Sequence, residues 1–252
     1  MILKAPVVSI ITITWNNLEG LKKTFESVVS QTALEHIEFI IIDGGSKDGS
    51  AEFLKQNETK ISYWQSEKDK GIYDAMNIGL TKCSGDYVWF LNAGDYAFSN
   101  DTLRQVLPFM EASADVIYGE TMLVSPEGKH LGSRSHLTTR KLPHTLTWKG
   151  FNKGMSVGHQ SILVKKSIAV PYDTEYKYVA DIDWVINCLK LAGNVINSGQ
   201  TIACFTVDGF STTNRNASNK QRYEVLKKHF GFFPNLINHA AILARKIFHN
   251  NN

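Results

Sequence analysis

The segment that most constrains this chain is an apolar run at residues 39–42 that ends in Asp43 and a Gly-Gly-Ser turn. A short apolar run bounded by glycines predicts a buried strand. In α/β proteins, ligands bind at the carboxyl ends of the strands, so Asp43 is placed to accept hydrogen bonds from a ligand. Gly44 and Gly45 let the backbone turn sharply. Taken alone, the segment is also compatible with an ordinary structural turn.

Two more segments repeat this arrangement. Residues 6–15 read PVVSIITITW, and the residues that follow have apolar side chains at helical spacing from Leu18 to Val29. Residues 87–95 read YVWFLNAGD. Strands that alternate with helices predict an α/β fold with a Rossmann-like, mostly parallel sheet flanked by helices, in which the strands share one ligand-binding edge.

The order of these motifs resembles the GT-A glycosyltransferases of the family-2 type, which build bacterial surface polysaccharides. The matching segments are VSIITITWNN, IIIDGGSKDGS, EKDKGIYDAMNIG, SGDYVWFLNAGD and VADIDW. The resemblance implies a GT-A domain over residues 1–215, with a nucleotide-binding half at about 1–112 and an acceptor half at about 113–215. Residues 216–252 are then expected to form a C-terminal helical extension.

The resemblance also implies which residues bind the nucleotide sugar. They are Thr14, Asn16, Asp43, Asp69, Lys70, Asn92, Ala93 and Gly94. Asp69 is expected near the base and Lys70 near the diphosphate. Asp74 is open to a simpler interpretation, because acidic residues at a helix start are stabilised by the helix dipole.

A divalent cation, Mn²⁺ or Mg²⁺, is the expected cofactor, since enzymes of this type hold one with an Asp-x-Asp element after the third of these strands. Here the element reads Asn92-Ala93-Gly94-Asp95, so two of the usual carboxylates are absent. Asp95 is the remaining charged ligand, and Asn92 can offer an amide oxygen; such ions bind through one or two carboxylates plus substrate phosphates. Alternatively, Asp95 caps the helix that begins near Asn100 or orders the loop.

The second half of the chain has fewer patterns. Residues 115–124 predict a strand, residues 126–129 a turn, and residues 133–153 a mobile loop that closes over the donor. His159 and Gln160 precede a strand at residues 162–166 and resemble an acceptor-side segment. A histidine in this position is equally compatible with a purely structural role.

The catalytic base is expected at the start of a helix in residues 179–184. The resembling family has Glu-Asp here, and its aspartate is the base; in this chain Ala180 replaces the glutamate and Asp181 matches the aspartate. We interpret Asp183 as a helix N-cap. Trp184 is assigned to the acceptor side.

Composition narrows the choice of partners. The net charge of +3 is too small to indicate nucleic acid, and the three cysteines are widely spaced, as expected of reduced core thiols without zinc. No apolar run approaches the roughly 18 residues of a membrane span, and no leader peptide is recognisable. A cytoplasmic protein is expected. An apolar helical stripe at residues 236–248 with basic neighbours indicates either contact with the membrane surface through 232–249 or a helix packed on protein.

Together these features predict an inverting glycosyltransferase that uses a UDP- or GDP-sugar and a saccharide or polyprenyl-linked acceptor. A dinucleotide-dependent oxidoreductase is disfavoured, because the first strand is not followed by G-x-G-x-x-G. A catalytically inactive nucleotide-sugar-binding or assembly subunit remains an alternative, given Asn92 and Gly94. The sugar, the linkage and the acceptor cannot be read from the sequence.

Overall fold

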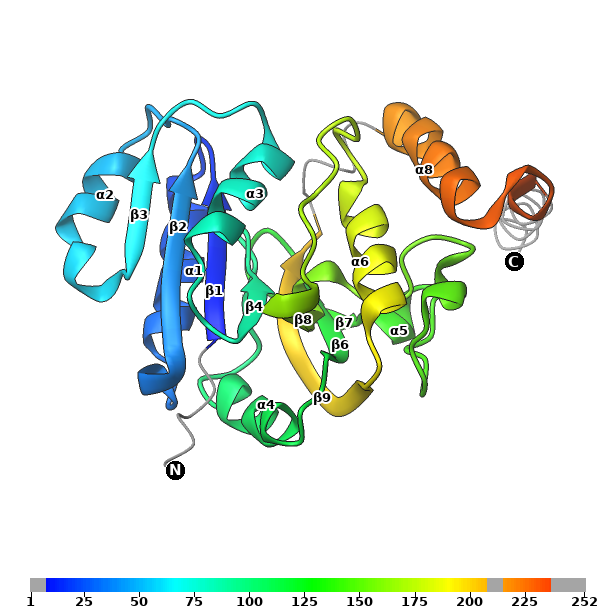
Figure 1. The fold of residues 1–252 in the computed structure, drawn as a ribbon. Helices are drawn as coiled ribbons and strands as arrows, with labels where there is room; N and C mark the ends of the chain where they lie inside the picture. Colours follow the sequence, from blue (N-terminus) through cyan, green and yellow to red (C-terminus); the bar gives the residue numbers. More distant parts are fainter. Residues whose placement is uncertain (1–7, 208–214, 237–252) are drawn as a thin grey trace.

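A computed structural model describes residues 8–207 and 215–236. The first part of the chain alternates strands and helices, as predicted (Figure 1). Its elements are β1 (Val8–Thr14), α1 (Leu18–Val29), β2 (Ile37–Asp43), α2 (Ser50–Gln56), β3 (Tyr63–Ser66), α3 (Ile72–Lys82) and β4 (Tyr87–Phe90). β1 pairs in parallel with β2 and β4, and β2 pairs in parallel with β3.

The second part completes a single mixed sheet. Its elements are β5 (Tyr96–Ala97), α4 (Thr102–Glu111), β6 (Val116–Val124), β7 (His130–Ser133), α5 (Arg134–Leu137), β8 (Ile162–Lys165), α6 (Ala180–Leu191), β9 (Val195–Thr206) and α8 (Arg215–Phe230). The strand order is β3-β2-β1-β4-β8-β6-β9-β5, with β7 beside β6. β8 is antiparallel to both neighbours, whereas β6 and β9 form a long parallel ladder. The predicted α/β fold is confirmed.

Apolar side chains on both faces of the sheet hold the layers together. Every residue of β1 is buried, and its alternate side chains enter two different clusters. Ile11 and Ile13 pack with α3 and α6, whereas Val8 and Ile10 pack with α1 and α4. A strand covered on both faces explains why this segment reads as a continuous apolar run.

The prediction of a mobile loop at residues 133–153 is wrong in part. Residues 134–137 form α5, and a 3-10 turn spans Trp148–Phe151. Leu146 and Phe151 are fully buried, and the Tyr118 hydroxyl donates to the carbonyl oxygen of Pro143 at 2.8 Å. Two isolated apolar anchors hold this segment on the domain, and they create no periodic pattern in the sequence.

The C-terminal part of the described chain is helical. α8 packs against α6 at one end of the molecule (Figure 1). Within residues 8–207 and 215–236, no helix has the length and apolar character needed to cross a bilayer. The predicted stripe at 236–248 lies, apart from Leu236, outside the described residues, and the division of the chain into 1–112, 113–215 and 216–252 stays a prediction.

Candidate active site

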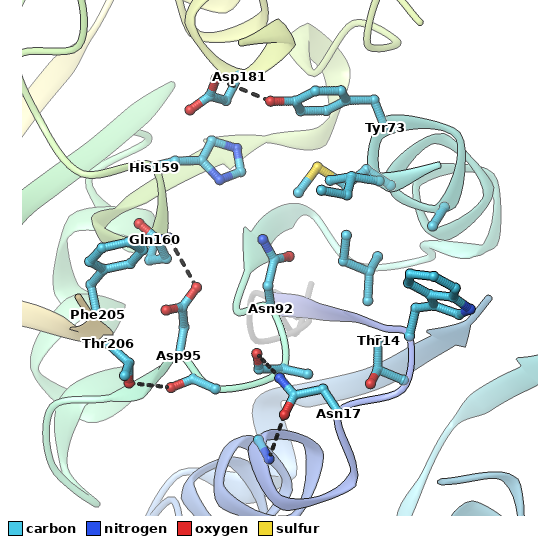
Figure 2. Close-up of a pocket in the computed structure, with 18 of the residues that line it drawn as sticks. Thr14, Asn17, Tyr73, Asn92, Asp95, His159, Gln160, Asp181, Phe205 and Thr206 are labelled. Carbon is cyan, nitrogen blue, oxygen red and sulfur yellow. Dashed lines mark hydrogen bonds between the residues drawn. The ribbon is translucent and has the colours of Figure 1, made fainter. Parts of the chain in front are cut away.

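A cavity of about 1260 Å³ opens where β1 and β4 end. The segments after β1 and β4 face α6 across it, and the end of β9 borders the segment after β4, where the Thr206 hydroxyl donates to the carbonyl oxygen of Gly94 at 3.1 Å (Figure 2). Most of the predicted site residues line this cavity, namely Thr14, Asp69, Lys70, Asn92, Ala93, Gly94, Asp95, His159, Gln160 and Asp181. Asn16, Asp43 and Trp184 are not among the lining residues.

Asp43 is fully buried at the end of β2, where its carboxylate is already engaged. It accepts hydrogen bonds from the hydroxyl groups of Ser46 and Ser66 and from the backbone N–H of Ser46. Asp69 lies next to this turn, and a Cβ on Gly44 would come within 2.6 Å of its carboxylate. A side chain at Gly44 would therefore displace the Asp69 carboxylate, and Asp69 lines the cavity at this corner.

Asn16 shapes the loop that follows β1. Its backbone has a positive φ of 47°, its side-chain oxygen accepts from the N–H of Lys47 at 2.9 Å, and its own N–H donates to Ser46 Oγ at 2.7 Å. The neighbouring Trp15 is 67% exposed and lines the cavity. Trp15 was not predicted as a site residue; its signal was a large aromatic side chain directly after a buried strand.

The 92–95 loop (Asn92, Ala93, Gly94 and Asp95) is held against the start of α1. Asn17 caps α1 by accepting from the N–H of Gly20 at 3.1 Å, and its side-chain amide donates to the carbonyl oxygen of Ala93 at 3.0 Å. Gly94 donates to the carbonyl oxygen of Gly20 at 3.0 Å and has a φ of 103°, which favours glycine over any residue with a Cβ. Asn17 was missed because its role depends on a contact distant in sequence.

Asp95 is buried in the cavity wall. Gln160 donates to its carboxylate at 2.9 Å, and burial raises the pKa of Asp95 to about 7, against the smaller opposing effect of Gln160 and of Lys23 on α1. The alternative that Asp95 caps the next helix is wrong, because the N-cap residue of α4 is Asp101.

Two buried side-chain oxygens of cavity residues accept or donate no hydrogen bond within the described part of the chain. They are Asn92 Oδ1 and Thr14 Oγ1. Asn92 projects toward the middle of the cavity, beside Asp95 (Figure 2). A carboxylate and an amide oxygen suit Mg²⁺ or Mn²⁺ when phosphate oxygens complete the shell, so these residues fit such an ion. No cluster of three or more His, Cys, Asp or Glu side chains with metal-binding geometry occurs in the described part of the chain.

Asp181 lies in the first turn of α6, across the cavity from the 92–95 loop (Figure 2). Burial raises its pKa to about 6. The hydroxyl of Tyr73, on α3, donates to its carboxylate at 3.3 Å, and the positive charge of Arg222 on α8 acts in the opposite direction to burial. A carboxylate with a pKa near 6 is ionised at neutral pH yet remains basic enough to accept a proton.

His159 is buried between the cavity and an aromatic cluster. Its Nε2 atom lies 2.8 Å from the Tyr172 hydroxyl, and burial lowers its pKa to about 4, so the ring is neutral. Trp184 packs beneath it at a ring-centroid distance of 5.6 Å and donates to the carbonyl oxygen of Val170. Trp184 is therefore a core residue that supports His159.

Asp183 does not cap α6, so that interpretation is wrong. The N-cap position is Val179, and Asp183 is a buried residue inside the first turn. Its carboxylate accepts from His229 Nε2 at 2.7 Å, a contact between α6 and α8. Asp74 does lie at a helix start, where it accepts from the N–H of Lys70 at 2.9 Å.

Several cavity residues had no place in the predicted site. The cations Lys23, Arg134 and Lys177 and the aromatic residues Tyr73 and Tyr176 all line it. Arg134 donates to the carbonyl oxygens of Ser156 and Met155, both at 2.8 Å, so its guanidinium braces the cavity wall. Lys23 carried a readable signal, since a helix that begins at the ligand-binding edge brings its first turns close to the site.

Comparison with known proteins identifies the family to which this chain belongs. The profile of "Glycosyl transferase family 2" matches residues 9–169. An uncharacterized glycosyltransferase of Mycobacterium tuberculosis H37Rv is 30% identical over 97% of this chain and 93% of its own length. A "PGL/p-HBAD biosynthesis glycosyltransferase" of Mycobacterium bovis BCG is 29% identical over 74% of this chain and 71% of its own.

Solved structures show the same fold at low sequence identity. Residues 1–349 of S. aureus TarS, in complex with UDP-GlcNAc, align with a TM-score of 0.70 at 17% identity, covering 87% of this chain and 64% of the TarS chain. The mannosyltransferase PcManGT from Pyrobaculum calidifontis, in complex with GDP-Man and Mn²⁺, aligns with a TM-score of 0.68 at 15% identity, covering 95% and 70%. The chain therefore belongs to glycosyl transferase family 2 and is a glycosyltransferase with a GT-A fold.

Proposed function

We propose that this enzyme transfers a sugar, with inversion, from a nucleoside-diphosphate sugar to a hydroxyl group of the acceptor. The observation that carries the proposal is the position of Asp181, a partly buried carboxylate of raised pKa that faces the 92–95 loop across one cavity. A base on one side and a diphosphate-binding loop on the other side suit an in-line displacement at the sugar.

In the proposed reaction, Asp181 removes the proton from the acceptor hydroxyl. The hydroxyl oxygen forms the new bond to the anomeric carbon while the bond from that carbon to the diphosphate oxygen breaks. Tyr73 holds the carboxylate of Asp181 by its hydrogen bond of 3.3 Å. The nucleoside diphosphate leaves with the bonding electron pair.

The donor side must compensate the charge of the diphosphate. We assign Thr14, Asn92 and the backbone of Ala93 and Gly94 to the donor, with Asp69 toward the nucleoside and Lys70 toward the phosphates; all of them line the cavity. Asp95 and Asn92 would hold a divalent cation, which supplies positive charge to the leaving group. UDP- and GDP-sugars are both compatible with this assignment, since TarS binds the former and PcManGT the latter.

The acceptor is proposed to be a saccharide or a lipid-linked saccharide that enters beside His159 and Gln160. The similarity to an enzyme of PGL/p-HBAD biosynthesis supports an acceptor of the glycolipid class. Phe232 and Phe233 are 49% and 75% exposed after the basic helix α8. This pairing of apolar and basic groups supports peripheral contact of a cytoplasmic enzyme with an anionic membrane face.

A catalytically inactive subunit, the alternative, would show no turnover of any nucleotide sugar, whereas the proposed enzyme would. Incubation with a panel of UDP- and GDP-sugars plus Mn²⁺ should release nucleoside diphosphate slowly even without acceptor, and a thermal-shift screen would identify the preferred donor. Asp181→Asn should lower turnover by roughly 10²- to 10⁴-fold with unchanged donor affinity. If the variant keeps transfer within threefold of the wild type, Asp181 is not the base. If the wild type turns over no donor, whether or not a donor binds, the inactive-subunit alternative holds.

A further inference from the structure

The first turn of α6 carries two aspartates that face different parts of the molecule. Asp181 lines the cavity, whereas Asp183 is 2% exposed and points toward α8. Residues two positions apart lie on nearly opposite sides of a helix. Both aspartates belong to the same helical turn, so a shift of the backbone at Asp183 also shifts Asp181.

α8 holds Asp183 with two cationic or polar groups. His229 Nε2 donates to Asp183 Oδ1 at 2.7 Å, and Lys228 Nζ lies 3.1 Å from the same oxygen. The second oxygen accepts from Asn187, one turn further along α6, at 3.0 Å. These contacts keep the pKa of Asp183 below its usual value in spite of burial, so the carboxylate is charged.

The hydrogen-bond partners define the tautomer of His229. A charged carboxylate can only accept, so Nε2 carries the proton. Nδ1 lies 2.8 Å from the ammonium group of Lys190, which can only donate, so Nδ1 is the acceptor. The His229 ring thus bridges two points on α6, Lys190 near its end and Asp183 near its start.

α8 also holds the chain just before α6. The side chain of Gln221 accepts from the backbone N–H of Tyr178 at 2.9 Å. This contact matters because α6 begins after Val179, which provides no side-chain cap for the exposed N–H groups of the first turn. The start of α6 is therefore fixed from α8 on both sides, through Tyr178 and through Asp183.

We propose that Gln221, Lys228 and His229 of α8 are positioning residues that set the place of Asp181 in the cavity. The inference rests on the proposed role of Asp181 as base. It assigns α8 to the catalytic unit, in addition to its packing role. The donor-binding residues lie at the end of β1 and on the segments after β3 and β4, so loss of the α8 contacts should impair the chemical step and spare donor binding.

The test compares His229→Leu, which removes the donor to Asp183, with His229→Gln, whose amide nitrogen can take the place of Nε2. We expect His229→Leu to lower kcat about 10-fold or more, since a shift of about 1 Å in a catalytic group can cost as much as 10²-fold. The donor KM and the calorimetric donor Kd should stay within about twofold, and His229→Gln should recover most of kcat. Each kcat is calculated from the concentration of folded protein, which is measured as the number of donor-binding sites per chain.

Two further variants keep the test decisive if His229→Leu folds poorly. Lys228→Met removes a partly exposed contact to Asp183 and should lower kcat severalfold with donor binding intact. Asp173→Asn is the matched control, because Asp173 is the other partner of Lys228, at 3.3 Å, and does not belong to α6. We expect its kcat to equal that of the wild type.

The inference is overturned if folded His229→Leu and Lys228→Met retain wild-type kcat, or if kcat and donor affinity fall together in parallel with melting temperature. The latter result would show that α8 only stabilises the fold. Failure of the proposed function gives a different pattern, because Asp181→Asn itself would then retain transfer. If Asp181→Asn loses transfer while His229→Leu and Lys228→Met keep a normal kcat, only the proposed role of α8 is refuted.

Discussion

Asp181 and Asp183 should respond in opposite directions to the same substitution. Burial raises the pKa of Asp181 from 3.8 to about 6, whereas the contacts with His229 and Lys228 lower the pKa of Asp183. Each pKa unit corresponds to about 1.4 kcal/mol of difference between the two protonation states. Ionised Asp181 therefore destabilises the fold by about 3 kcal/mol at neutral pH, an upper estimate since part of the side chain meets solvent.

The pH dependence follows from these directions. Well below pH 3.8, Asp181 is protonated in the folded and the unfolded chain, and it has no effect on their balance. As the pH rises toward 7, the unfolded chain loses this proton first, so the wild type loses stability that Asp181→Asn keeps. Asp181→Asn should thus be roughly as stable as the wild type at pH 4 and more stable by 1 kcal/mol or more, up to about 3 kcal/mol, at pH 7.

Asp183→Asn provides the matched control on the same helix turn. Its folded-state pKa is lowered, so its stabilising contribution is complete above about pH 4, the ordinary value, and disappears as the pH falls through the folded-state pKa. At pH 7 we expect Asp183→Asn to lose about 1–3 kcal/mol, the typical effect of losing a charged hydrogen-bond partner.

Urea unfolding at several values between pH 4 and pH 8 measures both effects. For a chain of this size, 1 kcal/mol corresponds to a melting shift of roughly 2–4 °C, so thermal scans serve as a second measurement. A stability difference between Asp181→Asn and the wild type that does not change with pH would refute the reasoning. So would equal signs for the two variants at pH 7.

Three further outcomes follow from the cavity. Arg222→Gln removes a positive charge near Asp181, so the apparent pKa on the acid side of the pH profile of kcat/KM should rise by about half a pH unit to one unit. Arg222→Lys keeps the charge and should leave this apparent pKa unchanged. Asp95→Asn should abolish any Mn²⁺-dependent gain in donor affinity, and equal donor binding by the wild type in EDTA would exclude a metal role. Gly94→Ala should weaken donor binding, since φ is 103° there, and an affinity equal to that of the wild type would show that the loop adapts.

β1 and β2 were predictable because most of their residues are buried, so that their sequences read as largely apolar runs. α1 shows helical spacing that ends where the structure ends it. β3 and α2 were not predicted; β3 has four residues, all only partly buried, which leaves no apolar run to recognise. β9 was missed although it has twelve residues, because it mixes polar and apolar side chains in no regular order: Gly199 and Gln200 in its middle are exposed, and the residues at 202–204 are buried. The two-residue β5 is too short for any pattern.

The site was predictable where it depends on strand ends and unpredictable where it depends on distant partners. The 92–95 loop lies at the ligand-binding edge, as the strand ends predict, whereas Asp181 on α6 was predicted from the family resemblance; both line one cavity. The sequence does not reveal that Ser66 would occupy the carboxylate of Asp43 from a neighbouring strand. Nor does it reveal that His229, 46 positions away, would bind Asp183. These contacts follow from packing, which has no local signature.

Asn92 and Gly94 stand where the usual pattern has carboxylates. The structure offers a reason for both residues, and this reason favours an active enzyme over a catalytically inactive subunit. Gly94 has a φ of 103°, a backbone conformation that residues with a side chain rarely adopt, and its N–H donates to the carbonyl oxygen of Gly20, so this loop conformation favours glycine over aspartate at this position. Asn92 keeps a buried oxygen to which no residue in the described part of the chain donates a hydrogen bond, and such an atom costs a folded chain roughly 1–3 kcal/mol. A degenerate site would be free to lose that cost by filling or closing the space around the oxygen. An amide oxygen left in this state by the described residues, on a side chain that lines a cavity beside a buried carboxylate, is the arrangement expected where a ligand supplies the missing partner.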